Sequence, residues 1–299
     1  MNVLMTGSTG LIGAALVSFL KEQGHSVTRL VRSQARPAAD EVLWQPQSDS
    51  FVADLPQPPD AVVHLAGEPV AGRWNKAKKE RIRSSRVDAT RVLSHALAAM
   101  PQPPAVLISA SASGYYGDRG DTVLTEASAP GSGFLAAICR DWEAATQPAS
   151  DAGIRVVHLR LGIVLSAKGG ALPKMLLPFR LGLGGNIGSG RQYWRWISLD
   201  DAIGVAHHAI VTESLRGAVN TVSPQPIRNS EFTRTLGRAL KRPTVLNVPA
   251  FALRLMLGQM ANELLLASAC IEPEQLKATR YAFQHPRLDG ALRDLLKQR

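Results

Sequence analysis

Cysteine is nearly absent from this chain of 299 residues, which carries only Cys139 and Cys270. Two thiols are too few for a disulfide framework or a cysteine-based zinc cluster, so we expect no structural metal. A chain of this length buries a large apolar core without such crosslinks. The composition therefore predicts an ordinary globular protein of one or two domains.

Long hydrophobic runs are also lacking. A membrane-spanning helix needs about twenty consecutive apolar residues, and no stretch of the chain approaches that length without a charge. Residues 1–7 have no basic leader and no long apolar core, so they predict a strand rather than a signal peptide. We therefore expect a soluble, cytoplasmic protein that makes no contact with a membrane.

Acidic residues are in short supply: 24 Asp and Glu face 34 Lys and Arg, which gives a formal net charge of +10. Residues 73–91 alone hold eight Lys or Arg against two acids. A basic protein can bind nucleic acid, but the chain shows neither a zinc-finger spacing nor an aromatic RNA-binding motif. A charge run of this kind is more often a solvated helix face, so nucleic acid is not an expected partner.

Glycine, by contrast, follows a clear pattern near the N-terminus. The apolar run at residues 3–5 predicts a buried parallel strand. Gly7, Gly10 and Gly13 come next, and apolar residues at helical spacing between 11 and 20 predict a helix. The order is strand, glycine turn and helix.

Each of the three glycines has its own physical role. Gly7 permits the tight turn off the strand, and Gly13 lets the helix pack close to the sheet. Gly10 lets the backbone approach a pyrophosphate with no Cβ in the way. The helix N-terminus then presents free N–H groups to the anion. In this context the glycines predict a dinucleotide-binding turn.

The end of the second predicted strand, at residues 26–31, indicates which dinucleotide is bound. An acid at this place hydrogen-bonds the ribose 2′-hydroxyl of NAD, but here the next residue is Arg32, with Arg29 and Arg36 nearby. A guanidinium suits a 2′-phosphate, which a carboxylate would repel. We therefore predict NADP(H), with Arg32 and Ser33 at the phosphate.

The glycine spacing, Gly-x-x-Gly-x-x-Gly, resembles that of the extended, epimerase-like branch of the short-chain dehydrogenase/reductase superfamily. The resemblance implies an α/β fold: a Rossmann-type, doubly wound parallel sheet with a smaller C-terminal substrate region. We expect an NADP-binding Rossmann domain at residues 1–165. Residues 166–299 would form the substrate side, including a helical C-terminal segment at 249–299.

The same resemblance implies which residues contact the cofactor. The strand at residues 61–67 ends against the cofactor, while His64 within it is expected to be an ordinary strand histidine. The basic segment lies alongside the pyrophosphate. The implied cofactor contacts are Gly7, Thr9, Gly10, Leu11, Ile12, Gly13, Arg32, Ser33, Leu65, Ala66, Gly67, Glu80, Arg86, Ser109 and Val164.

A strand at residues 105–111 runs into a segment similar to the Ser-Ser-x-x-x-Tyr-Gly stretch of this branch, which holds a catalytic Ser or Thr. Counting from the strand matches Ser111 to that residue, whereas counting back from the Tyr-Gly pair matches Ala112. We prefer Ser111 and add Tyr116 as a second catalytic candidate.

The Tyr-x-x-x-Lys pair, normally the proton-transfer machinery of these enzymes, is missing. The corresponding positions are Leu135 and Cys139, and no Tyr or Lys occurs between residues 117 and 167. Tyr115, Tyr116, Asp118 and Cys139 could supply a proton instead, although each also has an ordinary structural interpretation.

Seven glycines between residues 169 and 190 predict a loop, either a lid over the substrate or a plain hairpin. In the sugar-nucleotide branch an arginine grips the diphosphate at the position that Trp194 holds here. Arg191, Trp194 and Arg195 are the substrate candidates, for an anionic or planar ligand other than a nucleotide sugar. Asp200 or Asp201 is expected to be the N-cap of a helix starting at Ala202.

Nearly the whole chain resembles one uncharacterised subfamily of atypical short-chain reductases with a C-terminal domain of unknown function. The segments that carry this resemblance are Gly-Tyr-Tyr-Gly-Asp at 114–118, Cys-Arg-Asp-Trp-Glu at 139–143 and Phe-Arg-Leu-Gly-Leu-Gly-Gly at 179–185. We expect an NADP(H)-dependent oxidoreductase or epimerase-like protein acting on an unknown small substrate, as a monomer or homodimer. The alternative is a non-catalytic NADP(H)-binding sensor.

Overall fold

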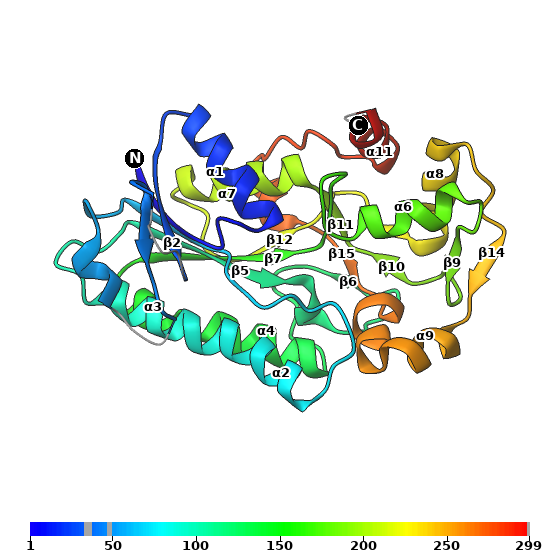
Figure 1. Cartoon of the computed structure of the whole chain (residues 1–299), viewed down its shortest axis with the longest axis horizontal. Helices are drawn as coiled ribbons and strands as arrows, with labels where there is room; N and C mark the ends of the chain where they lie inside the picture. Colours follow the sequence, from blue (N-terminus) through cyan, green and yellow to red (C-terminus); the bar gives the residue numbers. More distant parts are fainter. Residues whose placement is uncertain (33–37, 47–49, 298–299) are drawn as a thin grey trace.

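A seven-stranded parallel sheet forms the centre of the computed structural model, which describes residues 1–32, 38–46 and 50–297 (Figure 1). The strands lie in the order β12-β7-β5-β4-β1-β2-β3, so the winding reverses between β1 and β4. A parallel sheet that reverses in this way binds ligands at the carboxyl ends of the strands beside the reversal. The predicted Rossmann-type fold class is confirmed.

The strands of this sheet are β1 (Asn2–Thr6), β2 (Ser26–Val31), β3 (Glu41–Leu43), β4 (Ala61–His64), β5 (Val106–Ala112), β7 (Arg155–Leu161) and β12 (Gly217–Thr221). Their helices are α1 (Leu11–Glu22), α2 (Lys76–Arg83), α3 (Ala89–Ala98), α4 (Phe134–Ala144), α5 (Gln147–Asp151) and α7 (Leu199–Val211). Short helical turns are η1 (Ser50–Asp54), η2 (Ser84–Asp88) and η3 (Ser113–Tyr116).

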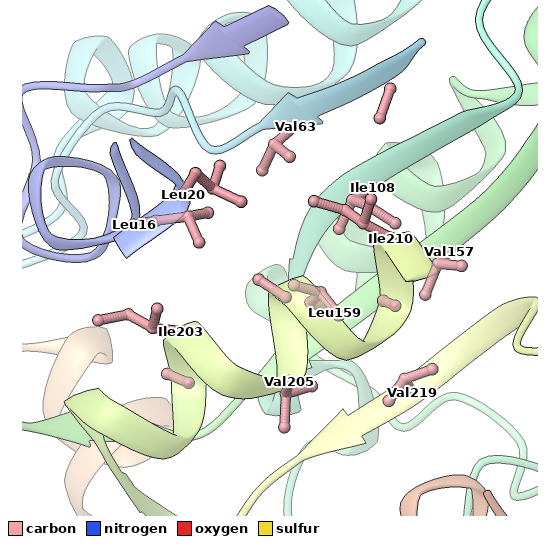
Figure 2. Close-up of a cluster of buried hydrophobic side chains, with 14 of the residues drawn as sticks. Leu16, Leu20, Val63, Ile108, Val157, Leu159, Ile203, Val205, Ile210 and Val219 are labelled. Atoms are coloured by element: carbon pink, nitrogen blue, oxygen red, sulfur yellow. The ribbon is translucent and has the colours of Figure 1, made fainter. Parts of the chain in front are cut away.

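Side chains on each strand alternate between two separate apolar layers. Val3 and Met5 point into the layer covered by α1 and α7, whereas Leu4 between them points into the layer covered by α3 and α5. Figure 2 shows the first layer, where Leu16 of α1 and Val205 of α7 face the strands. Because both faces of the sheet are covered, its strands are continuous apolar runs.

The smaller region has its own apolar core at the end of the molecule away from the N-terminus (Figure 1). Its helices are α6 (Leu172–Arg180), α8 (Asn229–Leu240), α9 (Ala250–Leu257), η4 (Ala261–Leu266) and α11 (Leu288–Lys297). Its strands are β8 (Ile163–Leu165), β9 (Gly185–Ile187), β10 (Tyr193–Trp194), β11 (Trp196–Ser198), β13 (Ile227–Arg228) and β14 (Leu246–Val248). The short elements β6 (Val123–Leu124), β15 (Cys270–Ile271) and α10 (Glu274–Ala278) complete the structure.

Two expectations for this region need correction. Residues 169–190 are not a lid or a plain hairpin, because their middle forms α6 and buries Leu172 and Leu176. The C-terminal segment at 249–299, predicted to be helical, is interrupted at Gly258, whose φ of +61° ends α9. Within the described ranges no helix combines the length and the apolar character that crossing a membrane would take.

The proposed division at residue 165 does not follow the sheet. After that point the chain forms β8 and α6 and then returns, because α7 packs on the sheet and β12 is its edge strand beside β7. The Rossmann core therefore includes residues 199–221, and the smaller region is built from segments on either side of them.

The start of α7 is also different from the prediction. The N-cap is Ser198, whose hydroxyl accepts a hydrogen bond from Asp201 N at 3.0 Å, so neither Asp200 nor Asp201 is the cap. The fully buried Asp201 carboxylate instead accepts hydrogen bonds from the backbone N–H groups of Gln284 and His285, at 2.7 and 2.9 Å. It thereby fixes the C-terminal segment against the sheet domain.

We expect Asp201→Asn to lower the free energy of unfolding by about 3 kcal/mol, because hydrogen bonds to a buried charge contribute about 1.5–3 kcal/mol each. The neighbouring Asp200 is 40% exposed, so Asp200→Asn should cost less than about 1 kcal/mol. Urea unfolding of both variants measures the difference, and equal losses would refute the role assigned to Asp201.

Candidate functional site

The turn between β1 and α1 leaves no room for side chains at two of its glycines. Gly7 has a φ of +70°, and a Cβ on it would lie 2.7 Å from Ala66 N. A Cβ on Gly13 would lie 2.1 Å from the carbonyl oxygen of Gly7. At Gly10 the nearest atom is 3.4 Å away. Gly7 and Gly13 are thus required by the protein's own packing, whereas Gly10 leaves its surroundings open to a ligand.

The N-terminus of α1 has the features of an anion site. Its N-cap is Gly10, no side chain caps it, and its first turn contains no acid. Thr9 and Gly10 are exposed, and Leu11 and Ile12 are partly so. The buried Ser8 hydroxyl has no hydrogen-bond partner in the described part of the chain. Uncapped N–H groups at a helix N-terminus suit the pyrophosphate of a dinucleotide.

At the end of β2 the predicted phosphate-binding residues separate into two groups. Arg29 is 2.7 Å from Asp40 and 3.1 Å from Glu41, so its charge is neutralised within the protein. Hydrogen bonding to Arg29 lowers the pKa of Asp40 to about 2. Arg32 follows β2 directly and is exposed. Ser33, like Arg36, lies outside the described residues.

At the end of β4, His64 is part of a buried polar chain. Its Nδ1 lies 2.7 Å from Thr6 Oγ1, and its Nε2 lies 2.9 Å from Thr90 Oγ1, which accepts a hydrogen bond from Trp142 Nε1. Complete burial lowers the pKa of His64 to about 4, so the imidazole is neutral at pH 7. This geometry agrees with its interpretation as a strand histidine. The adjoining Leu65, Ala66 and Gly67 remain partly or fully exposed at the strand end.

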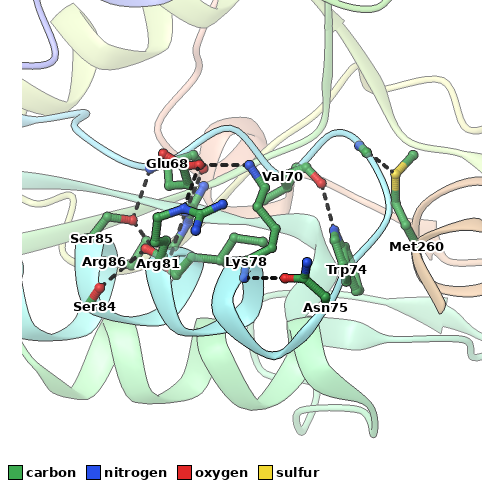
Figure 3. Close-up of polar contacts among 12 residues, drawn as sticks. Glu68, Val70, Trp74, Asn75, Lys78, Arg81, Ser84, Ser85, Arg86 and Met260 are labelled. Atoms are coloured by element: carbon green, nitrogen blue, oxygen red, sulfur yellow. Dashed lines mark hydrogen bonds and ion pairs between the residues drawn. The ribbon is translucent and has the colours of Figure 1, made fainter. Parts of the chain in front are cut away.

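The basic segment forms a continuous helical stretch through α2, η2 and α3. Glu68 pairs with Lys78 at 2.8 Å and with Arg81 at 3.5 Å, as Figure 3 shows. Arg86 turns inward and donates a hydrogen bond to the backbone oxygen of Glu68 at 2.9 Å. Glu80, the other cofactor candidate on this segment, is exposed.

Arg86 also lies against the end of β4. Its guanidinium atoms come within 3.2–3.4 Å of where a Cβ on Gly67 would be. Its guanidinium carbon is 5.1 Å from the centre of the Trp142 ring. Arg86 is thus placed beside the proposed cofactor contacts Leu65, Ala66 and Gly67.

Ser111, near the end of β5, belongs to a buried ionic network. Its hydroxyl donates to Glu143 Oε1 at 2.6 Å. The same carboxylate accepts two hydrogen bonds from Arg160, at 2.9 and 2.8 Å. Arg160 Nη1 in turn donates to the hydroxyl of Tyr116 at 2.8 Å. Both charges of this network are neutralised internally.

Tyr116 is completely buried, and its hydroxyl lies 2.7 Å from Asn220 Oδ1 and 3.0 Å from the Thr125 carbonyl oxygen. Burial raises the pKa of Tyr116 to about 12. Such a hydroxyl is a poor proton donor at neutral pH. Its hydrogen-bond partners, Arg160, Asn220 and Thr125, are all protein groups. The geometry therefore favours a positioning role for Tyr116 over a direct catalytic one.

The positions of the missing Tyr-x-x-x-Lys pair lie on α4. Leu135 packs against Gly114. Cys139 is buried, and burial raises the pKa of its thiol to about 12. Glu263, a residue that the sequence analysis missed, accepts hydrogen bonds from the backbone N–H groups of Phe134 and Leu135 and caps this helix from 128 residues away in the sequence.

The three substrate candidates have very different surroundings. Arg191 is exposed. Trp194 belongs to the core of the smaller region, where its ring packs against Phe232 with the ring centres 4.9 Å apart. Arg195 is buried, and its Nε donates to the Ser113 hydroxyl at 3.1 Å.

The two remaining cofactor candidates lie on strands. Ser109 is fully buried within β5. Val164 is partly buried in β8, opposite Ile197 of β11. Ser109 is the middle residue of β5, level with His64 at the end of β4, and Val164 comes three residues after the end of β7.

This chain belongs to the NAD dependent epimerase/dehydratase family, which matches residues 3–220. A domain of unknown function, DUF1731, matches residues 248–295. The family expected from the sequence motifs, including its C-terminal domain, is confirmed.

Individual relatives are similar over nearly the full chain. Epimerase family protein Mb2239 of Mycobacterium bovis is 44% identical over 97% of this chain and 96% of its own length. The crystal structure of human epimerase family protein SDR39U1 with NADPH is 35% identical, covers 100% of both chains and has a TM-score of 0.92. A nucleoside-diphosphate sugar epimerase from Corynebacterium glutamicum is 37% identical with a TM-score of 0.82, over 99% of this chain and 58% of that one.

We expect Gly13→Ala to lower the free energy of unfolding by at least about 2 kcal/mol, because the added methyl group collides with backbone rather than with a flexible side chain. Gly10→Ala is the matched control and should cost about 1 kcal/mol or less, the usual cost of alanine at an N-cap. Thermal and urea unfolding of the protein without ligand measure both. Equal stabilities for the two variants would contradict the assigned packing.

Proposed function

We propose that this protein binds NADP(H) at the β1–α1 turn and catalyses oxidoreductase or epimerase-type chemistry on a small substrate. The observation that carries the proposal is the glycine turn. Backbone atoms fill the space beside Gly7 and Gly13, whereas the space beside Gly10 is open and no side chain caps the N-terminus of α1. The human relative SDR39U1 has been crystallised with NADPH, which supports the same cofactor here.

Arg32 would select the phosphorylated dinucleotide. Its side chain is exposed directly after β2, where the adenosine ribose of a Rossmann-bound dinucleotide lies. Arg29 is neutralised by Asp40 and Glu41, so it adds little to binding of a 2′-phosphate. Ser33 is retained as a second phosphate contact on the strength of its position after the second strand alone.

At the other end of the dinucleotide, Ser111 is the residue best placed to hold a substrate oxygen. When bound, NADP(H) supplies or accepts the hydride. The Glu143 carboxylate orients the Ser111 hydroxyl, and Arg160 holds that carboxylate in place through two hydrogen bonds. Tyr116 positions Arg160 from the opposite side.

A non-catalytic NADP(H) sensor is the second candidate, and one observation favours it. The positions of the usual proton-transfer pair hold Leu135 and Cys139, and burial raises the pKa values of both Cys139 and Tyr116 to about 12. Leu135 carries no ionisable proton, and neither Cys139 nor Tyr116 releases a proton readily near pH 7. An enzyme without the usual tyrosine and lysine would take the proton for its reaction from solvent or from the substrate.

Several expectations remain predictions. A cytoplasmic location and a monomeric or homodimeric state rest on the sequence alone. Nucleic-acid binding is not part of the proposal, because the sequence has no zinc-finger spacing and no aromatic RNA-binding motif. Part of the charge of the basic segment is also engaged within the protein, since Lys78 and Arg81 share Glu68, and Arg83 and Arg91 share Asp88.

Arg32→Ala should weaken NADPH binding about tenfold or more and leave NADH binding nearly unchanged, since a charge-assisted hydrogen bond contributes about 1.5–3 kcal/mol. Fluorescence titration with each nucleotide measures the effect. Arg91→Ala removes another exposed arginine, on α3, and should change neither affinity. A parallel loss for both nucleotides would rule out the 2′-phosphate contact.

A screen of small carbonyl compounds and sugars against the NADPH-loaded protein separates the enzyme from the sensor. For any compound that is turned over, Ser111→Ala should lower kcat/KM about tenfold, because the hydroxyl, whose proton is donated to Glu143, can no longer accept a hydrogen bond from a substrate hydroxyl, a contact that contributes about 0.5–1.5 kcal/mol. Ser94→Ala removes another buried hydroxyl, on α3, and serves as the control. Tight NADPH binding with no turnover of any compound would favour the sensor.

A further inference from the structure

The buried arginines of the site differ in how their charges are compensated. Arg160 is paired with Glu143 through two hydrogen bonds. Arg195 is equally enclosed, with only 7% of its surface exposed, but in the described part of the chain it forms no ion pair. Its one side-chain hydrogen bond runs from Nε to the Ser113 hydroxyl. Burial lowers the pKa of Arg195 to about 10, so the charge persists at pH 7. The acid that acts on it, Asp118, is exposed and forms no ion pair with it.

The place of Arg195 in the fold is tightly determined. Its backbone oxygen accepts a hydrogen bond from Ile163 N at 2.6 Å, and a Cβ on Gly162 would lie 2.5 Å from that oxygen. Arg195 is thereby held beside the end of β7. Its contact with Ser113, which directly follows β5, brings the guanidinium over the carboxyl ends of these two strands.

The terminal nitrogens Nη1 and Nη2 of Arg195 form no hydrogen bond with any residue that the structure describes, and neither is among the fully enclosed atoms without a partner. Neither nitrogen is therefore fully enclosed, and both are free to donate hydrogen bonds to a ligand. A guanidinium presents these two N–H groups side by side, in the geometry that matches the two oxygens of a carboxylate.

A second cation lies close by. Arg86 and Arg195 both lie within electrostatic range of Cys139, the residue at the family's lysine position. Glu68, the acid that acts on Arg86, already forms ion pairs with Lys78 and Arg81. Glu143 acts on the same thiol, but it is paired with Arg160. Burying a charge without a partner costs several kcal/mol, a cost that an anionic ligand offsets.

We propose that the substrate of this protein carries a carboxylate, bound by the two terminal nitrogens of Arg195 beside Ser113, with Arg86 adding to the positive potential. The inference rests on the proposed function, because it places this carboxylate at the reacting end of the dinucleotide site. It makes small organic acids, rather than neutral carbonyl compounds or sugars, the substrate class to test.

The experiment uses the full-length protein loaded with NADPH and titrates it with acetate, propionate or benzoate at constant ionic strength, with chloride as the reference anion. We expect saturable binding of the carboxylates, detected as a change in nicotinamide fluorescence and as a rise in Tm. Arg195→Met should weaken this binding at least tenfold, while NADPH affinity stays within about twofold of the original protein, since losing one charge-assisted carboxylate contact exceeds about 1.4 kcal/mol. Arg216→Met, at an exposed position before β12, is the matched control and should respond like the original protein.

Stability distinguishes an anion-binding residue from a structural one. Because Arg195→Met removes an uncompensated buried charge, its Tm without carboxylate should equal or exceed that of the original protein. A fall in Tm would show that Arg195 is needed by the fold and would overturn the proposal. So would the absence of carboxylate binding, or equal binding by Arg195→Met. Failure of NADPH itself to bind would instead refute the proposed function, which is measured separately in the same titration.

Discussion

Gly13 lies so close to the carbonyl oxygen of Gly7 that any side chain at this point would overlap it. This contact fixes the distance and direction of α1 relative to β1. Leu16 and Leu20 of the helix then reach the apolar layer that α7 shares with the strands, as Figure 2 shows. The same contact directs the uncapped N-terminus of α1 toward the reversal between β1 and β4, so the packing of the core and the placement of the anion site have one common cause.

The two buried arginines beside Ser111 and Ser113, Arg160 and Arg195, differ in whether an acid pairs with them. Around Arg160 every charge is satisfied: Glu143 pairs with it, and Tyr116 and Ser111 complete the network. This part is rigid and internally neutral, which suits the positioning of Ser111. Around Arg195 no acid among the described residues forms an ion pair, and Asp118 acts on it only from an exposed position, so positive potential is left for a ligand. The site therefore combines a preformed polar support with a cation whose partner comes from outside the protein.

The comparison between sequence and structure shows which inferences depend only on local patterns. The strands, the glycine turn and the start of α1 follow from apolar periodicity and from glycine chemistry. Each of these elements begins within one residue of the predicted start, although the strand predicted at 61–67 ends at His64. Predictions that depend on the surroundings of a side chain were less accurate. Trp194 resembled a ligand contact and is core, and Arg29 resembled a phosphate contact and is paired with Asp40 and Glu41.

Long-range contacts explain why those inferences failed. Asp201 fits an N-cap by its position before a helix, yet its carboxylate holds residues more than 80 positions later. Glu263 caps α4 from the C-terminal region, and no feature of either segment alone indicates that pairing. Even α6 within the glycine-rich stretch forms because its leucines find a core made by α8 and α11. Helix formation there depends on tertiary packing more than on local propensity.

The sequence by itself determined the doubly wound sheet, the dinucleotide turn and the absence of the usual tyrosine and lysine. Each of these features depends on residue types that lie close together in the sequence. Only the tertiary structure decided which charges are compensated, since ion pairing depends on residues that are distant in the chain and adjacent in space. Arg29, Arg160 and Arg195 look alike in the sequence. Their surroundings make the first two structural, and leave the third buried without an ion pair in the described part of the chain.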